Sequence, residues 1–229
     1  MSHDALAVRA QHPRRFRCKA FLFDLDGVLV DSRTVVERTW RSWAERHHID
    51  AERLLRVAHG RRTRDTLQAV VPHLDLDSEV AWLDATELAD LDGLVAIPGA
   101  GRLLAALPAG AWAIVTSGTR RLACRRLEAA GLPIPPVLIT SEAVTRGKPA
   151  PDGYRLAVEC LGQEPAACVA FEDAPPGVAA ARGAGTRVVA LMTTHLADEL
   201  AGADVVIRDL AQVSVRISSA GLVATVGAA

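Results

Sequence analysis

The chain has 229 residues, a formal net charge of −1 and 50% hydrophobic residues, enough for one large domain or one domain with an insertion. Because there is no excess of basic residues and only 4% aromatic residues, the composition argues against binding to nucleic acid or to an anionic membrane. The cysteines lack zinc-binding spacing and no apolar run reaches transmembrane length, so we expect a cytoplasmic protein with free thiols.

The first predicted element is a buried strand over 19–24, which follows a polar lead-in over residues 1–18. The lead-in lacks the apolar stretch of a secretory signal. The strand ends in Asp24-Leu25-Asp26-Gly27, and ligands of open α/β sheets bind just beyond the carboxyl ends of strands. Asp24 and Asp26 are therefore candidate active-site residues. The alternative is an ordinary polar turn, because Asp and Gly are common turn residues.

Residues 32–96 have helical periodicity and no convincing strand. Val36, Trp40 and Trp43 recur at helical spacing, which predicts one apolar helix face. An insert of about 60 residues is too long for an ordinary loop. We therefore predict a small helical cap domain over 32–96, with hinges near 30–33 and 96–99, and with the tryptophans in its core rather than against substrate.

After Pro98-Gly99 the pattern changes to alternating short apolar runs and helical segments. Such alternation is typical of βαβ units, so we predict an α/β, doubly wound, Rossmann-like parallel sheet formed by residues 19–31 and 97–229. The predicted elements are strands over 112–116, 137–140, 168–171, 187–191 and 204–207, helices over 120–130, 151–161, 176–184 and 195–201, and a hairpin over 213–217 and 222–226.

Three further strand ends carry polar groups that could meet Asp24 at one edge of the sheet. They are Thr116-Ser117-Gly118, Lys148 in Gly147-Lys148-Pro149, and Glu172-Asp173. Lys148 is notable because only two of the 26 basic residues are lysines. Each segment has an ordinary alternative, namely a loop with a helix N-cap, a solvated turn, or a pair of acids at a helix start. The three alternatives are harder to accept together than singly, because all the segments occur, in chain order, at predicted strand ends.

The combination of residues suits phosphoryl transfer. A carboxylate cluster is a hard-oxygen site that favours Mg²⁺, so we predict a magnesium site from Asp24, Asp26, Glu172 and Asp173. Asp173 is expected to bind the metal directly and Glu172 to act through water. Asp24 can attack phosphorus, and Asp26 can protonate the leaving alkoxide and later deprotonate water.

The remaining groups suit binding of the phosphate itself. The Thr116 hydroxyl and the backbone N–H groups of Ser117 and Gly118 can donate hydrogen bonds to phosphate oxygens. Lys148 supplies a compact positive charge to the phosphate and to Asp24.

These motifs resemble those of haloacid dehalogenase-type phosphohydrolases with a helical cap of subclass I. The residues that carry the resemblance are Asp24-Leu25-Asp26-Gly27-Val28, Thr116-Ser117-Gly118, Gly147-Lys148-Pro149 and Phe171-Glu172-Asp173-Ala174. The resemblance spans about residues 19–210 and implies Asp24 as nucleophile, Asp26 as acid/base, Thr116 and Lys148 as phosphate ligands, and Asp173 as a Mg²⁺ ligand. Residues 59–65, 97–99, 112–120 and 171–175 are in addition similar to segments of glycerol-phosphate and 2-deoxyglucose-6-phosphate phosphatases. This narrower resemblance implies a small phosphorylated polyol or sugar as substrate.

In the predicted cap, His59 and Arg62 are the expected contacts to the part of the substrate beyond the phosphate. The alternative is a solvated arginine-rich helix face. Two other functions remain open. A hexose-phosphate mutase would need a second phosphate site in the cap, which contains no lysine. A non-catalytic phospho-sensor would need neither Asp26 nor a cap. We expect a monomer or small homo-oligomer.

Overall fold

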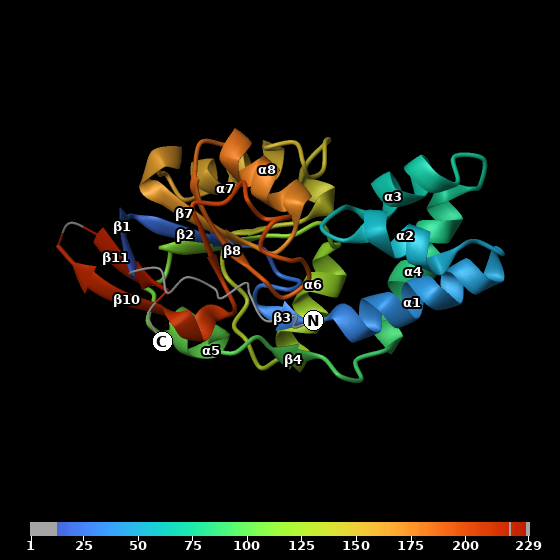
Figure 1. The fold of residues 1–229 in the computed structure, drawn as a ribbon, viewed down its shortest axis with the longest axis horizontal. Helices are drawn as coiled ribbons and strands as arrows, with labels where there is room; N and C mark the ends of the chain where they lie inside the picture. The colour runs from blue at the N-terminus through green and yellow to red at the C-terminus, as the bar shows by residue number, and fades with distance from the viewer. Residues whose placement is uncertain (1–12, 220, 228–229) are drawn as a thin grey trace, which may run out of the picture.

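The computed structural model describes residues 13–219 and 221–227. At its centre lies a six-stranded parallel sheet in the order β6-β5-β2-β7-β8-β9 (Figure 1). The strands are β2 (Ala20–Phe23), β5 (Trp112–Val115), β6 (Leu138–Ile139), β7 (Cys168–Glu172), β8 (Arg187–Leu191) and β9 (Val205–Ile207). The predicted α/β class with a doubly wound parallel sheet is therefore confirmed.

The alternation of side chains along β2 divides the core into two layers. Phe21 and Phe23 point to one face, where Phe23 stacks on Phe171 of β7 with ring centroids 4.9 Å apart. Ala20 and Leu22 point to the other face. Because successive residues of a strand face opposite sides, a strand buried on both faces is apolar throughout.

Helices cover both faces of the sheet. Helices α5 (Ala100–Ala105) and α6 (Arg120–Ala129) pack on the face of the phenylalanines. Helices α7 (Asp152–Cys160) and α8 (Pro175–Gly183) pack on the other face. Short 3₁₀ turns at Ser141–Ala143, Pro165–Ala167 and Leu210–Gln212 connect the elements. The sequence analysis did not predict α5, whose six residues are too few for a clear helical period.

A separate antiparallel sheet lies at the end of the core remote from the helical cap (Figure 1). It contains the predicted hairpin, now seen as β10 (Val213–Ser218) and β11 (Gly221–Val226). Its third strand is β1 (Arg14–Cys18), which pairs with β11. The structure thus differs from the expected lead-in over 1–18, because Phe16 and Cys18 are buried in the core. Residues 1–12 of that lead-in lie outside the described residues.

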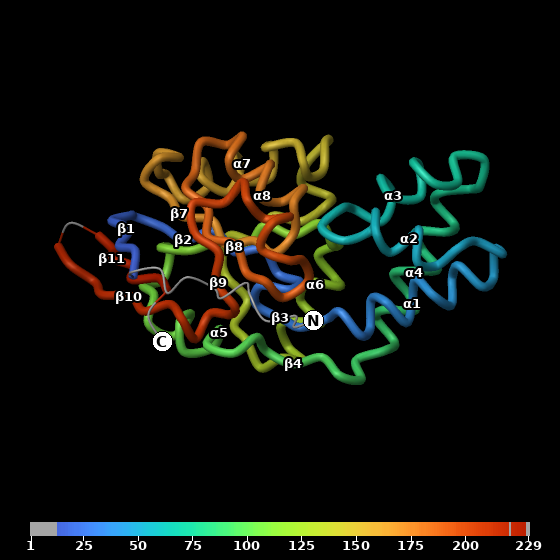
Figure 2. The backbone as a smooth tube through the Cα atoms, in the orientation of Figure 1, coloured from blue at the N-terminus to red at the C-terminus, as the bar shows by residue number. Residues whose placement is uncertain are grey.

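The insert forms the predicted helical cap. Its helices are α1 (Arg33–Arg46), α2 (Ala51–Ala58), α3 (Thr63–Val70) and α4 (Leu76–Ala89). They enclose a hydrophobic cluster of their own, in which Trp40 and Trp43 are buried, and the His47 ring packs against Trp43 with ring centroids 4.4 Å apart. The backbone trace enters and leaves the cap through two adjacent segments, β3 (Val30–Asp31) and β4 (Val95–Ala96), which pair antiparallel (Figure 2). None of the described helices combines the length and apolar character needed to cross a membrane.

The prediction of a helix over 195–201 is wrong. The segment forms turns, with Leu200 buried and Leu196 71% exposed. Two local contacts favour the turns: the Leu196 N–H donates to Glu199 Oε2, and the His195 ring contacts the Asp173 carbonyl oxygen. Side-chain partners of this kind offer the backbone an alternative to helical hydrogen bonds.

Candidate active site

Strand β2 delivers Asp24 to the edge of the sheet that faces the cap. The Asp24 N–H donates to the Phe171 carbonyl oxygen at 2.9 Å, which continues the ladder between β2 and β7 by one residue. The chain then turns sharply at Gly27, whose φ is +76°. A Cβ at Gly27 would lie 2.1 Å from Asp173 Oδ2, so only glycine lets this turn pass over the Asp173 carboxyl.

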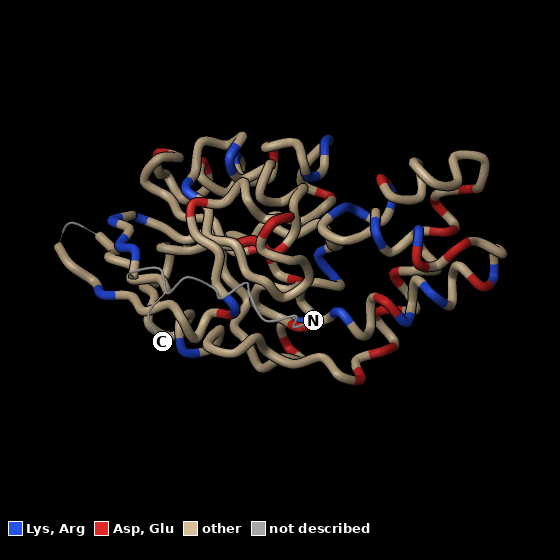
Figure 3. Tube along the Cα trace, in the orientation of Figure 1, with Lys and Arg blue, Asp and Glu red and all other residues tan. Residues whose placement is uncertain are grey.

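Three carboxyl groups converge at this edge. Asp24, Glu172 and Asp173 each offer an oxygen within 4.8 Å of the others, and all three are buried. Figure 3 shows acidic positions at the ends of the central strands. Lys148 Nζ lies 2.9 Å from Asp24 Oδ1 and 2.7 Å from Glu172 Oε1, and the Tyr154 hydroxyl also donates to Glu172 Oε1, at 2.5 Å. Lys148 and Tyr154 therefore fix Glu172 within the group.

Burial and the neighbouring charges shift the pKa values of Asp24, Asp173 and Lys148. Burial raises the pKa of Asp24 to about 7; Lys148 opposes this rise, and the neighbouring carboxylates Glu172 and Asp26 add to it. Burial and the repulsion of Asp24 and Glu172 raise the pKa of Asp173 well above its usual range. For Lys148, burial favours the neutral form, but Asp24 and Glu172 outweigh it and raise the pKa. Lys148 therefore remains an ammonium ion.

The donor set fits a divalent metal ion. Three buried carboxyl groups face a single ammonium group, so the ionised cluster carries an excess of negative charge that is costly away from water. Carboxylate oxygens are the ligands that hard cations prefer. The Asp26 carboxylate, expected among the metal ligands, is not part of this group in the described residues; it lies with Ser32 and Arg126 instead.

The loop after β5 brings the predicted phosphate-binding residues to the same edge. Thr116 is buried, and its Oγ1 accepts a hydrogen bond from the Gly118 N–H at 3.1 Å. The Ser117 hydroxyl donates to the Gly60 carbonyl oxygen of the cap at 3.1 Å. Thr119 then caps α6 by accepting from the Leu122 N–H. Asp24, Thr116, Ser117 and Gly118 line one cavity of about 90 Å³ that opens to solvent, and Lys148 lines an adjoining smaller cavity that also contacts Thr116 and Ser117.

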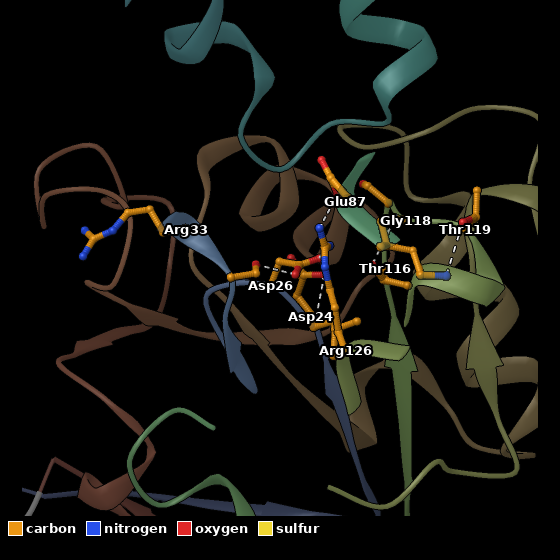
Figure 4. A network of polar contacts seen from close by, with 12 residues as sticks. Asp24, Asp26, Arg33, Glu87, Thr116, Gly118, Thr119 and Arg126 are labelled. Carbon is orange, nitrogen blue, oxygen red and sulfur yellow. Dashed lines mark hydrogen bonds and ion pairs between the residues drawn. The ribbon is translucent and has the colours of Figure 1, made fainter. Parts of the chain in front are cut away.

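Asp26 lies on the same cavity but has its own partners. Its Oδ1 accepts from the Ser32 hydroxyl at 2.5 Å, and its Oδ2 pairs with Arg126 Nη1 at 2.7 Å. Arg126 Nη2 also pairs with Glu87 of helix α4. Figure 4 shows the Arg126 guanidinium between Asp26 and Glu87, while Arg33 points away from them.

The two cap residues expected to contact substrate occupy different places. His59 lines the cavity; its Nδ1 bonds to the Leu55 carbonyl oxygen at 2.9 Å, and its buried Nε2 has no partner among the described residues. Arg62 does not line this cavity. Its guanidinium pairs with Asp65 and donates to the Val144 carbonyl oxygen at 3.2 Å, so it joins the cap to the core.

The sequence analysis missed Arg126, Glu87 and Tyr154. Arg126 carries a sequence signal, because it follows Leu122 by four residues and so falls on the buried face of α6. Glu87 and Tyr154 carry the same kind of signal, because Glu87 follows the buried Leu83 by four residues on α4 and Tyr154 lies on the buried face of α7. Their polar partners lie in distant segments and leave no local signal.

Comparison with known proteins decides the family. The model of the haloacid dehalogenase-like hydrolase family matches residues 18–185. The chain belongs to this family. The hydrolase is 44% identical over 204 residues to hexitol phosphatase A of Escherichia coli, an alignment that covers 87% of this chain and 94% of the relative. It is 34% identical over 212 residues to glycerol-1-phosphate phosphohydrolase 2 of Saccharomyces cerevisiae, with 86% of this chain and 84% of the relative covered.

A solved structure agrees with this assignment. A hydrolase from Pseudomonas syringae, 28% identical, superimposes on this hydrolase with a TM-score of 0.74, over 85% of this chain and 94% of the other. The predicted family resemblance, the fold with its helical cap and the enzyme class of phosphatase are confirmed.

The raised pKa of Asp24 predicts how the metal-free hydrolase responds to pH. The folded state keeps a proton on Asp24 up to about pH 7, whereas the unfolded chain loses that proton near pH 4. The stability that this proton contributes to the fold is therefore complete below about pH 4 and is lost as the pH rises through 7. In chelator, the free energy of unfolding should fall by at least about 1 kcal/mol between about pH 5 and pH 8. Urea unfolding at each pH measures it. In Asp24→Asn the decrease should be smaller; an equal decrease would assign the effect to other groups.

Proposed function

We propose that this hydrolase removes the phosphoryl group from a small polyol or sugar phosphate monoester, with Mg²⁺ as its metal ion. The observation that carries the proposal is the buried Asp24 carboxyl, held by Lys148 beside two further carboxylates at the base of an open cavity. The names of the relatives support the substrate class, since both act on phosphorylated polyols.

The first half of the reaction forms an aspartyl-phosphate. An Asp24 carboxylate oxygen attacks phosphorus, and the bond from phosphorus to the ester oxygen breaks. Asp26 gives its proton to that oxygen, so that the product leaves as an alcohol rather than as an alkoxide. Thr116, the N–H groups of Ser117 and Gly118, and Lys148 hold the phosphoryl oxygens. Mg²⁺, when held by Asp24 and Asp173 with Glu172 behind them, supplies positive charge that offsets the repulsion between two anions.

The second half regenerates the enzyme. A water molecule attacks phosphorus, Asp26 takes the proton from that water, and inorganic phosphate departs as Asp24 regains its carboxylate. Asp26 thus alternates between acid and base within one turnover.

We propose that the cap, residues 32–96, closes the cavity and contacts the part of the substrate beyond the phosphate. His59 is the cap residue best placed for this contact because it lines the cavity; its Nδ1 donates to a carbonyl oxygen, which leaves the buried Nε2 as an acceptor. For Arg62, a role at the junction of cap and core fits its contacts better than a role in recognition.

We also propose a cytoplasmic location, which the four free cysteines favour, and a monomer or small homo-oligomer.

A substrate screen tests the function. We expect phosphate release from some of four classes, namely glycerol phosphates, hexose 6-phosphates, deoxy-sugar phosphates and phosphoglycolate, with polyol and sugar esters turned over faster than phosphoglycolate. Phosphate release and sugar isomerisation are measured in the same reactions. Isomerised hexose phosphate without free phosphate would indicate a mutase, and an aspartyl-phosphate that persists for minutes without turnover would indicate a phospho-sensor.

A further inference from the structure

Arg126 stands between the acid/base Asp26 and the cap. Its side chain is only 5% exposed, and its guanidinium pairs with Asp26 Oδ2 at 2.7 Å and with Glu87 of α4. Asp26 and Arg126 belong to the core, whereas Glu87 belongs to the cap. The Ser32 hydroxyl occupies the other Asp26 oxygen, so both oxygens of this carboxylate are fixed in direction.

A purely structural role explains Arg126 poorly. Two carboxylates face one buried guanidinium, and taking such charges out of water is unfavourable unless every partner is well placed. Well-packed apolar residues would join helix and cap at lower cost. Within α6, the other arginines, at 120, 121 and 125, are exposed. Arg126 and Glu87 also line the same cavity as Asp24 and Asp26.

We propose that Arg126 is a positioning residue for the acid/base step, and that Glu87 of the cap holds its guanidinium in the direction that this step requires. The inference rests on the proposed function. A guanidinium offers donors in a rigid planar fork, so it can bond to Asp26 and Glu87 at once and fix the angle between them. Because Glu87 belongs to the cap, the Arg126 guanidinium has both of its carboxylate partners only when the cap lies where it does here.

Two substrates with different leaving groups distinguish a role of Arg126 in positioning Asp26 from a role in stabilising the fold. A polyol leaves as a strongly basic alkoxide and therefore depends on a proton from Asp26. A p-nitrophenolate delocalises its charge and leaves without that proton. An incorrectly placed Asp26 should therefore slow the first substrate and spare the second, whereas a damaged fold slows both.

The experiment compares Arg126→Lys with the unaltered enzyme in single turnovers, with enzyme in excess over substrate. Lysine keeps the charge, but its single ammonium nitrogen cannot occupy both positions, Nη1 and Nη2, from which the guanidinium bonds to Asp26 and to Glu87. Release of glycerol from glycerol 1-phosphate should slow about a hundredfold, as expected for a displaced catalytic group, with its KM in steady state little changed. Release of p-nitrophenol from p-nitrophenyl phosphate should change at most a few-fold. Following the first turnover matters because the later attack of water uses Asp26 with both substrates.

Two further variants complete the test. Arg125→Lys, on the exposed side of α6, should leave both rates unaltered. Glu87→Gln, which keeps the size of the side chain, should show a weaker form of the same selective loss. Equal slowing with both substrates, or no slowing with either, would overturn the inference and leave the proposed function intact. If instead the unaltered enzyme releases no alcohol from any phosphate monoester of the screen, the proposed function itself is wrong.

Discussion

Asp24→Asn is expected to lower phosphate release by about 10⁴-fold or more, the scale of losses seen when a covalent nucleophile is removed. The amide cannot displace the ester oxygen, so no acyl phosphate forms. The fold should persist, because the substitution removes one negative charge from a buried group that also contains Glu172 and Asp173. Phosphate release measures the loss, and circular dichroism checks that the variant unfolds cooperatively.

A second measurement identifies the nucleophile directly. Acid quenching during turnover should trap one phosphoryl group on the peptide that contains Asp24 in the unaltered enzyme, and none in the variant. Asp92→Asn, at an exposed position, is the matched control and should retain full activity. Substantial turnover by Asp24→Asn, or a phosphoryl group trapped on another residue, would show that Asp24 is not the nucleophile.

Removal of divalent metal should abolish phosphate release, and added Mg²⁺ should restore it. A metal ion bound at Asp24, Glu172 and Asp173 would offset their charge and that of the incoming phosphate. Its binding should also stabilise the fold, by about 2.7 kcal/mol when Mg²⁺ is at a hundred times its dissociation constant. The midpoint of thermal unfolding, followed during titration of chelated protein with Mg²⁺, measures this binding independently of activity.

The same titration includes its own control. Asp173→Asn should lose most of the thermal shift, whereas Asp198→Asn, in an exposed turn, should keep it. Phosphate release that continues in excess chelator would contradict the metal requirement, and an unchanged shift in Asp173→Asn would place the ion elsewhere.

Much of the core and its site could be predicted because the information is local. Apolar runs such as 112–115 identify buried strands, and the polar residues that follow them lie at one edge of a parallel sheet whatever the order of its strands. Asp24, Thr116 and Asp173 could therefore be predicted to meet at this edge from the amino-acid sequence alone. The prediction of a helix over 195–201 was wrong because side-chain contacts hold this segment in turns, and the helical periodicity of the sequence does not indicate those contacts.

The sequence by itself determined the strands, the helical insert and the residue types at the strand ends, because each depends on neighbours within a few positions. Only the tertiary structure decided what those residues touch. Asp26 and Arg126 are 100 positions apart in the chain, Arg126 and Glu87 are 39 apart, and neither pair leaves a periodic trace. A buried charge is stable only beside its partner, and that partner is chosen by how the helices pack on the sheet and the cap on the core.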